Sequence, residues 1–264
     1  MPETQLEKYK KDMLDRVSTY NSNGSLQNTS RDFFNQIGVG KADYVYNFFW
    51  LGIPIIQIPQ DLQAFQEIIW EVKPDLIIET GIAWGGSLVF SASMLAILEV
   101  SGAINNGQVL GIDIDIRQHT RKLINSHPLT NKITMLEGSS INNNIINNVK
   151  LFAEKHKRIM VFLDSNHTHE HVLAELEAYA PLVSPGSYCI VADTIIDDAP
   201  ESMLEKRPWN KDNNPKTAVR EYLSLLESEM LLGEDGRQLN FEVDKTLEHK
   251  LVLTGSPDGF LKRI

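Results

Sequence analysis

The chain has few basic residues and almost no cysteine, and each shortage excludes a class of protein. Its 264 residues include 25 Lys and Arg against 35 Asp and Glu, a formal net charge of -10. Because nucleic-acid binding normally needs a basic surface, we expect no nucleic acid as the main partner. The single cysteine, Cys189, lies in an apolar run and has no second cysteine to pair with. We expect a buried thiol in a protein of a reducing compartment.

Long apolar segments are also missing. No run reaches the ~18 apolar residues of a membrane-spanning helix, and residues 1–20 are charged and polar where a signal peptide has an apolar centre. We therefore expect no membrane partner and a cytoplasmic location. The chain is 42% hydrophobic and 23% charged, which is enough apolar material for one large domain with a sizeable core.

From residue 76 onward, short apolar runs alternate with longer amphipathic ones. This alternation is typical of a parallel sheet covered by helices on both faces. The predicted strands are 76–80, 109–113, 133–137, 159–163 and 187–192. The predicted helices between them are 86–100, 117–125, 141–156 and 168–181, with Ser140 as the N-cap of the third.

The two ends of the chain differ from this middle part. A polar segment at 197–215 precedes a predicted helix at 217–230 and a hairpin of strands at 239–243 and 249–254. Five parallel strands and a closing hairpin give an α/β, Rossmann-like sheet of seven strands, the outline of a class I methyltransferase domain at 61–264. Residues 1–60 form an N-terminal extension with a charged helix at 3–19, a loop at 21–30 and an apolar aromatic run at 44–58. We expect the extension to cover the site or to form an oligomer contact.

In such a sheet, ligands bind outside the carboxyl ends of the strands. The first strand runs into Glu79 and the glycine-rich turn Gly81–Gly86, where glycines allow backbone N–H groups to approach a ligand closely. Packing alone is the alternative reason for such a turn. Its spacing is not G-x-G-x-x-G, which argues against a nicotinamide-dependent oxidoreductase.

The second and third strands also end in polar residues. Asp113 is placed to accept hydrogen bonds from both hydroxyls of a ribose, and Asp115 is the second candidate for this role. Ser139 follows the third strand, where it either flanks an adenine or helps to cap the next helix.

The fourth and fifth strands end in Asp164 and Asp193, whose carboxylates we expect to lie close together. Like charges this close need a cation or a shared proton, and Mg²⁺ prefers oxygen ligands. His167 is positioned to point at the same ion and to remove a proton from an acceptor hydroxyl. The alternatives are that both aspartates cap backbone groups and that His167 is a surface residue. We expect His169 and His171 to be solvated or helix-face residues.

Four segments carry a resemblance to a known family. They are Glu79–Ser87, Gly111–Asp115, Leu163–His167 with His171–Leu176, and Pro257–Arg263. Together they resemble the cephalosporin hydroxylase family over about residues 45–264. That family comprises S-adenosylmethionine- and Mg²⁺-dependent O-methyltransferases, including macrolide-sugar and rhamnosyl methyltransferases.

The resemblance implies an O-methyltransferase that acts on a hydroxyl of a sugar, a glycan or a glycosylated small molecule, and relatives assemble into multimers, so we expect a homo-oligomer. It implies S-adenosylmethionine in the glycine turn, Mg²⁺ at the fourth and fifth strand ends, and His167 as the catalytic base. The residues expected to bind the cofactor are Glu79, Thr80, Gly81, Gly85, Ser87, Asp113, Ser139 and Asp164.

One departure from the family concerns the fifth strand. Relatives usually have two adjacent acids at its end, whereas this chain has Ala192-Asp193. The expected metal ligands are therefore Asp164, Asp193 and either Thr194 or an additional water. Ala192 is also the best support for the alternative of a catalytically inactive S-adenosylmethionine-binding scaffold. The polar insert at 197–216 is either a lid over the acceptor or a solvated loop.

Overall fold

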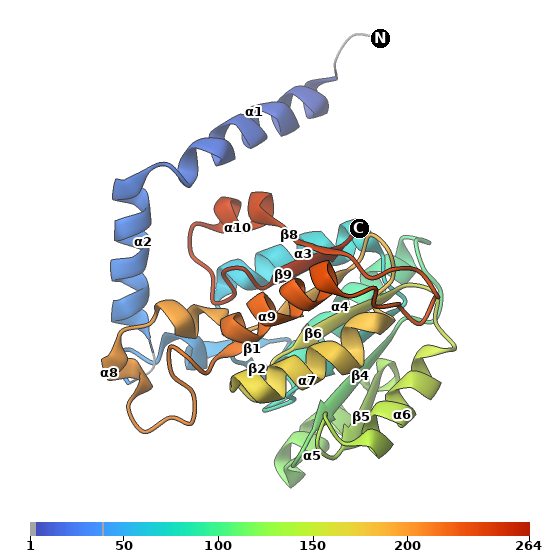
Figure 1. The fold of residues 1–264 in the computed structure, drawn as a ribbon. Helices are drawn as coiled ribbons and strands as arrows, with labels where there is room; N and C mark the ends of the chain where they lie inside the picture. The colour runs from blue at the N-terminus through green and yellow to red at the C-terminus, as the bar shows by residue number, and fades with distance from the viewer. Residues whose placement is uncertain (1–3, 39) are drawn as a thin grey trace.

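The computed structural model describes residues 4–38 and 40–264 and folds most of them into three layers, with helices on both faces of one sheet (Figure 1). The seven strands lie in the order β5-β4-β3-β6-β7-β9-β8. Their bounds are β3 Leu76–Thr80, β4 Gln108–Asp113, β5 Ile133–Glu137, β6 Ile159–Leu163, β7 Tyr188–Val191, β8 Phe241–Val243 and β9 Phe260–Arg263. The first five are parallel, and β9 and β8 complete one edge in antiparallel pairing. The predicted class I methyltransferase outline is confirmed.

Helices cover both faces of the sheet, as the sequence predicts. One face carries α3 (Pro59–Val72), α4 (Gly86–Val100), α5 (Gln118–Ser126) and α10 (Lys245–Leu251), and the other carries α6 (Asn143–Ala153), α7 (His169–Tyr179) and α9 (Pro215–Ser228). Short 3-10 turns are η1 Tyr44–Asn47, η2 Thr130–Lys132, η3 Ala180–Leu182 and η4 Thr194–Asp198. The predicted cap of α6 is wrong, because the side chain of Asn142, not Ser140, accepts the Asn144 N–H.

The parallel strands are buried on both faces because the side chains of successive residues pack into two separate apolar cores. Ile77 packs in the core under α3 and α4, whereas Ile78 packs in the core under α6, α7 and α9. Pairing of Ile78 with Leu110 on one side and Val161 on the other aligns the strands. Their carboxyl ends therefore meet at one edge, where the polar residues that follow them gather.

The predicted hairpin at the end of the chain is partly wrong. Residues 249–254 do not form a strand; Asp244 caps the helix α10 instead, and Leu247 packs into the core under α3. The strand that pairs with β7 is instead β9, which lies beyond the end of the predicted strand. A short apolar run does not distinguish a buried helix from a strand, and here long-range packing decides.

The N-terminal extension contains more helix than its sequence indicates. The helix α1 (Gln5–Tyr20) is as predicted, but the expected loop at 21–30 lies mostly in α2 (Gly24–Ile37), where Asn23 accepts the Leu26 N–H as an N-cap. The aromatic run forms a small hairpin, β1 (Phe48–Trp50) and β2 (Ile53–Ile55). The sequence analysis predicted no helix at Pro59–Val72, which form α3, the first helix of the chain that packs on the sheet.

In Figure 1, α1 projects from the body above α10, and α2 descends to the short helix α8 (Glu201–Leu204).

Within the described residues, no helix combines the length and the apolar character that crossing a membrane requires.

Candidate active site

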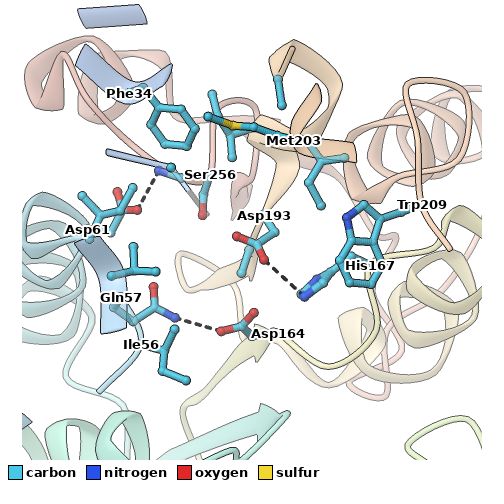
Figure 2. Close-up of a pocket in the computed structure, with 18 of the residues that line it drawn as sticks. Phe34, Ile56, Gln57, Asp61, Asp164, His167, Asp193, Met203, Trp209 and Ser256 are labelled. Atoms are coloured by element: carbon cyan, nitrogen blue, oxygen red, sulfur yellow. Dashed lines mark hydrogen bonds and ion pairs between the residues drawn. The ribbon is translucent and has the colours of Figure 1, made fainter. Parts of the chain in front are cut away.

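Three side chains converge at the carboxyl edge of the sheet, as Figure 2 shows. Asp164 directly follows β6, His167 lies in the turn before α7, and Asp193 directly follows β7. One potential ligand atom from each lies within 4.8 Å of the others, and His167 Nε2 is 3.2 Å from Asp193 Oδ2. The neighbouring strands β6 and β7 are paired in parallel register, so the residues after them share one edge. We call these three residues the acid–histidine group.

Electrostatics favours a cation in this group. Withdrawal from bulk water raises the pKa of Asp164 well above its usual range, and the negative charge of Asp193 raises it further. A hydrogen bond from Gln57 acts in the opposite direction. Two carboxylates and an imidazole are a donor set that binds a divalent ion, whose charge would offset this repulsion.

The sequence analysis missed Gln57, which holds one oxygen of Asp164. Its Nε2 donates to Asp164 Oδ2 at 2.8 Å, and the other carboxylate oxygen lies on the side of Asp193 in Figure 2. Gln57 follows β2, in the hairpin that packs beneath α4. The signal that marks it is a lone polar side chain in the apolar run 53–59.

Thr194 does not join the acid–histidine group. Its hydroxyl is fully buried and donates to the carbonyl of Pro257 at 2.6 Å. The left-handed backbone of Asp193, with φ 56°, begins the 3-10 turn η4 and directs Thr194 toward the loop before β9. The structure therefore does not bear out Thr194 as a metal ligand, and the third side chain of the group is His167.

The glycine turn is shaped by close packing on every side. A Cβ at Gly81, whose φ is +87°, would collide with the carbonyl of Asp164, and one at Gly85 would meet Ile124 at 2.6 Å. Thr80 is fully buried, and its hydroxyl accepts from the Asp164 N–H at 3.3 Å. These glycines are needed for packing, whether or not a ligand also approaches the turn.

Asp113 reaches back to the same turn. Its Oδ2 accepts hydrogen bonds from the backbone N–H of Ile82 at 2.8 Å and of Ala83 at 3.3 Å. Its Oδ1 accepts from the backbone N–H of Asp115 at 3.1 Å. Asp115 itself is exposed beyond the strand end. Asp113 is thus the acid of this strand that faces the turn, and Ser139 lies half-buried after the neighbouring strand.

Glu79 is buried under the turn and is 1% exposed. Ser87 donates to its Oε1, whereas its Oε2 has no hydrogen-bond partner among the described residues. Burial raises the pKa of Glu79 to about 8, and the hydrogen bond from Ser87 lowers it. At neutral pH the folded protein therefore holds Glu79 mainly as the neutral acid.

This protonation gives a stability prediction. The folded pKa lies above the unfolded value of 4.5, so the stability from the neutral acid is present below pH 4.5 and is lost as pH rises through about 8. Glu79→Gln mimics the neutral form. We expect the melting temperature of Glu79→Gln minus that of the wild type to increase by roughly 5–10 °C from pH 5.5 to pH 8.5. Thermal unfolding at both pH values measures this, with the exposed Glu242→Gln as a control that shows no such trend.

His169 and His171, expected to be solvated or helix-face residues, lie on α7 and contact other side chains. His171 Nε2 lies 3.0 Å from Ser140 Oγ and 3.5 Å from Oε1 of the buried Glu175. His169 Nδ1 lies 2.8 Å from the hydroxyl of Thr217. Both therefore hold α7 against its neighbours, and neither belongs to the acid–histidine group.

A cavity of about 390 Å³ opens beside the acid–histidine group. Its walls come from the end of α2, the segment 56–58, α3, η4 and α8, so the N-terminal extension and the 197–215 insert both enclose it. Phe34 of α2 and Met203 of α8 lie side by side at its rim in Figure 2. Beside the acid–histidine group, the indole of Trp209 packs edge-on against the His167 ring, with 4.8 Å between the ring centroids. The Arg207 guanidinium lies 5.5 Å from the indole centroid.

The fold has solved relatives. A structure of CmcI with Mg and SAM matches with a TM-score of 0.54 at 19% identity, over 86% of this chain and 80% of that chain. A seven-stranded sheet with one antiparallel edge and polar residues after its parallel strands is the architecture of a class I methyltransferase. The protein has that fold.

The sequence identifies the family within this class. The family described as rhamnosyl O-methyltransferase/CmcI matches residues 42–264, and the chain belongs to it. A rhamnosyl O-methyltransferase of Mycobacterium bovis is 28% identical over 230 residues, which are 83% of this chain and 82% of that protein. One from Mycobacterium leprae is 29% identical over 155 residues, 57% of this chain and 62% of that protein.

Proposed function

We propose that the protein transfers a methyl group from S-adenosylmethionine to a hydroxyl of a sugar, a glycan or a glycosylated small molecule, with assistance from Mg²⁺. The observation that carries the proposal is the acid–histidine group, which faces a cavity at the ligand edge of a class I methyltransferase fold. Family membership and the rhamnosyl O-methyltransferase names of the relatives support a sugar acceptor.

The residues fit both groups that this reaction needs. Asp164 and Asp193 would hold the metal, which supplies a positive charge that lowers the pKa of the acceptor hydroxyl. Asp113 and the turn that it braces would hold the cofactor's ribose. Under the same turn, Oε2 of the neutral Glu79, which has no hydrogen-bond partner among the described residues, would offer an O–H donor. Thr80, Gly81, Gly85, Ser87, Ser139 and Asp164 complete the proposed cofactor site.

His167 is the proposed base. Its Nε2 faces the group and takes the acceptor proton there, and Asp193 at 3.2 Å stabilises the resulting imidazolium. Gln57 fixes the orientation of Asp164, and Trp209 covers one edge of the imidazole and excludes water from it. Holding two reactants in line can contribute about 7–11 kcal/mol of the rate acceleration.

The N-terminal extension and the insert would bind the acceptor. Gly38 at the end of α2 has no room for a Cβ because the Met203 side chain of α8 lies against it. The two segments therefore meet over the cavity, which supports the interpretation of the insert as a lid. On this view, residues 1–60 serve the same active site as the domain at 61–264.

The proposal is tested by incubating the purified protein with S-adenosylmethionine, Mg²⁺ and a panel of rhamnosides, other glycosides and nucleotide sugars. Mass spectrometry is expected to detect one added methyl group on at least one glycoside. S-adenosylmethionine binding without transfer to any acceptor would favour the inactive scaffold. Failure to bind S-adenosylmethionine would reject the proposal altogether.

Asp113→Ala is expected to weaken S-adenosylmethionine binding by roughly 10- to 100-fold, because it removes a charge-assisted acceptor and the brace of the turn. Calorimetric titration measures the effect. Asp115→Ala is the matched control, since this exposed acid lies two residues further on, and its affinity should stay near the wild-type value. A normal affinity for Asp113→Ala together with a weakened Asp115→Ala would assign the ribose to Asp115.

We further propose a homo-oligomer that works in the cytoplasm. Leu6, Tyr9 and Leu14 of the projecting helix α1 are exposed, and such an apolar surface is suited to contact with a second copy. The single cysteine is buried and unpaired, which is consistent with a reducing compartment.

A further inference from the structure

One buried carboxyl on the cavity wall has no part in the proposed mechanism. Asp61 lies in the first turn of α3 and is 1% exposed. Its Oδ2 accepts from the N–H of Gly255 at 2.8 Å. Its Oδ1 has no hydrogen-bond partner among residues 4–38 and 40–264. A buried oxygen without a partner is uncommon in a folded protein and needs an explanation.

Charge pairing does not supply that explanation. No Lys, Arg or His of the described chain forms an ion pair with Asp61. Burial raises the pKa of Asp61 to about 7, and the negative charge of Asp193 contributes to the rise. The Thr254 hydroxyl and the Gly255 amide lower it. Burial of this carboxyl without a cationic partner among the described residues is costly, and the Gly255 N–H accounts only for its Oδ2.

The position of Asp61 in the cavity makes contact with the acceptor possible. Asp61 lines the same cavity as the acid–histidine group. In Figure 2, Asp61 and Gln57 lie on one side of this cavity and His167 on the other, with Asp164 and Asp193 between them. Asp61 and His167 therefore line one cavity from different sides, so that a single acceptor in it can face both.

The wall around Asp61 is mainly apolar. Phe34, Ile58 and Ile195 line the cavity with it, and these side chains offer no hydrogen bond to an acceptor. Besides Asp61, the polar side chains labelled at this end of the cavity are Gln57 and Ser256. A carboxyl oxygen accepts hydrogen bonds, and a sugar hydroxyl is the complementary neutral donor.

We propose that Asp61, through Oδ1, binds a second hydroxyl of the acceptor sugar and so selects which hydroxyl reaches His167; this inference rests on the proposed function. Asp61 is then a specificity-determining residue that contacts the acceptor and takes no part in proton transfer. Two anchored hydroxyls fix the orientation of a sugar ring, whereas one leaves it free to rotate.

Asp61→Asn separates this role from a structural one. The amide oxygen still accepts from Gly255 at the same place, and removal of a buried ionisable group costs no stability, so the melting temperature should not fall below that of the wild type. The second oxygen becomes an NH₂ donor. We expect the affinity for 4-nitrophenyl α-L-rhamnopyranoside, measured by calorimetry with S-adenosylhomocysteine present, to fall roughly tenfold or more.

Analogues that each lack one ring hydroxyl make the test specific. In the wild type, removal of one particular hydroxyl, other than the one that is methylated, should weaken binding about tenfold, and in Asp61→Asn the same removal should have little further effect. Asp235→Asn, which alters a carboxylate at the opposite edge of the sheet, is the control and should leave glycoside binding unchanged.

Two results would overturn the inference. One is an Asp61→Asn variant that binds the glycoside and its analogues like the wild type, and the other is a wild-type protein that binds none of these glycosides. Glycoside binding that depends on Asp61 but leads to no methyl transfer would reject the proposed function and leave Asp61 as a sugar-binding residue. The two failures are therefore distinguishable.

Discussion

His167→Ala is expected to lower the turnover of methyl transfer by roughly 10²- to 10⁴-fold, the usual contribution of a positioned general base. The Nε2 of His167 faces the acid–histidine group beside Asp193, and no other imidazole of the described residues belongs to that group. The affinity for S-adenosylmethionine should change by less than about twofold, because loss of a base acts on the chemical step. Steady-state kinetics and calorimetry together measure both quantities.

His169→Ala is the matched control for this prediction. His169 lies two residues away and contacts Thr217 and Glu221 instead of the group, so its removal should leave most of the turnover intact. The Mg²⁺ dependence distinguishes two roles for His167. A base leaves the Mg²⁺ concentration for half-maximal activity unchanged, whereas a ligand raises it when removed. A His167→Ala enzyme with full turnover would exclude both roles.

Asp164→Asn is expected to raise the Mg²⁺ concentration for half-maximal activity at least roughly tenfold, because it removes an anionic ligand from the group. A second consequence needs no activity measurement. Burial and neighbouring negative charge raise the pKa of Asp164, so a neutral side chain removes an unfavourable charge. In EDTA we therefore expect Asp164→Asn to melt a few degrees above the wild type.

With added Mg²⁺, the wild type should instead have the higher melting temperature of the two proteins. Binding to the folded wild type raises its melting temperature, whereas the variant responds little. Thermal unfolding in EDTA and across a Mg²⁺ series measures this, with Asp115→Asn as a control that behaves like the wild type under both conditions. An Asp164→Asn enzyme that is stabilised and activated by the same Mg²⁺ concentrations as the wild type would place the ion elsewhere.

The five parallel strands and most of the helices between them could be predicted because their signals are local. Apolar runs such as 159–163 alternate with amphipathic segments, and the polar residues after each run mark its carboxyl end. Asp164 and Asp193 follow neighbouring strands, so their convergence is implied once the strands are known to be parallel. The same reasoning preferred Asp113 to Asp115 as the candidate ribose acid, and the structure places Asp113 against the glycine turn.

Elements that depend on distant partners were predicted less well. The run at 249–254 contains apolar residues that suit either a strand or a helix. Its first three residues end the helix α10, whose Leu247 and Leu251 pack into the core under α3. Asn23 belongs to the residue types of loops, but here it caps α2, whose last turn buries Ile37 against Ile58 and Leu253. No window of sequence contains these contacts.

The sequence by itself determined the five parallel strands, the edge at which their carboxyl ends meet, and the two aspartates at that edge, because strand periodicity and the positions of strand ends are encoded in neighbouring residues. Only the tertiary structure decided which other side chains reach the site. Gln57 and Asp61 arrive from segments more than a hundred residues before Asp164 and Asp193, and Thr194 turns away although it adjoins Asp193. The direction of a side chain depends on backbone angles and on packing partners distant in the chain, and neither is written in the local pattern.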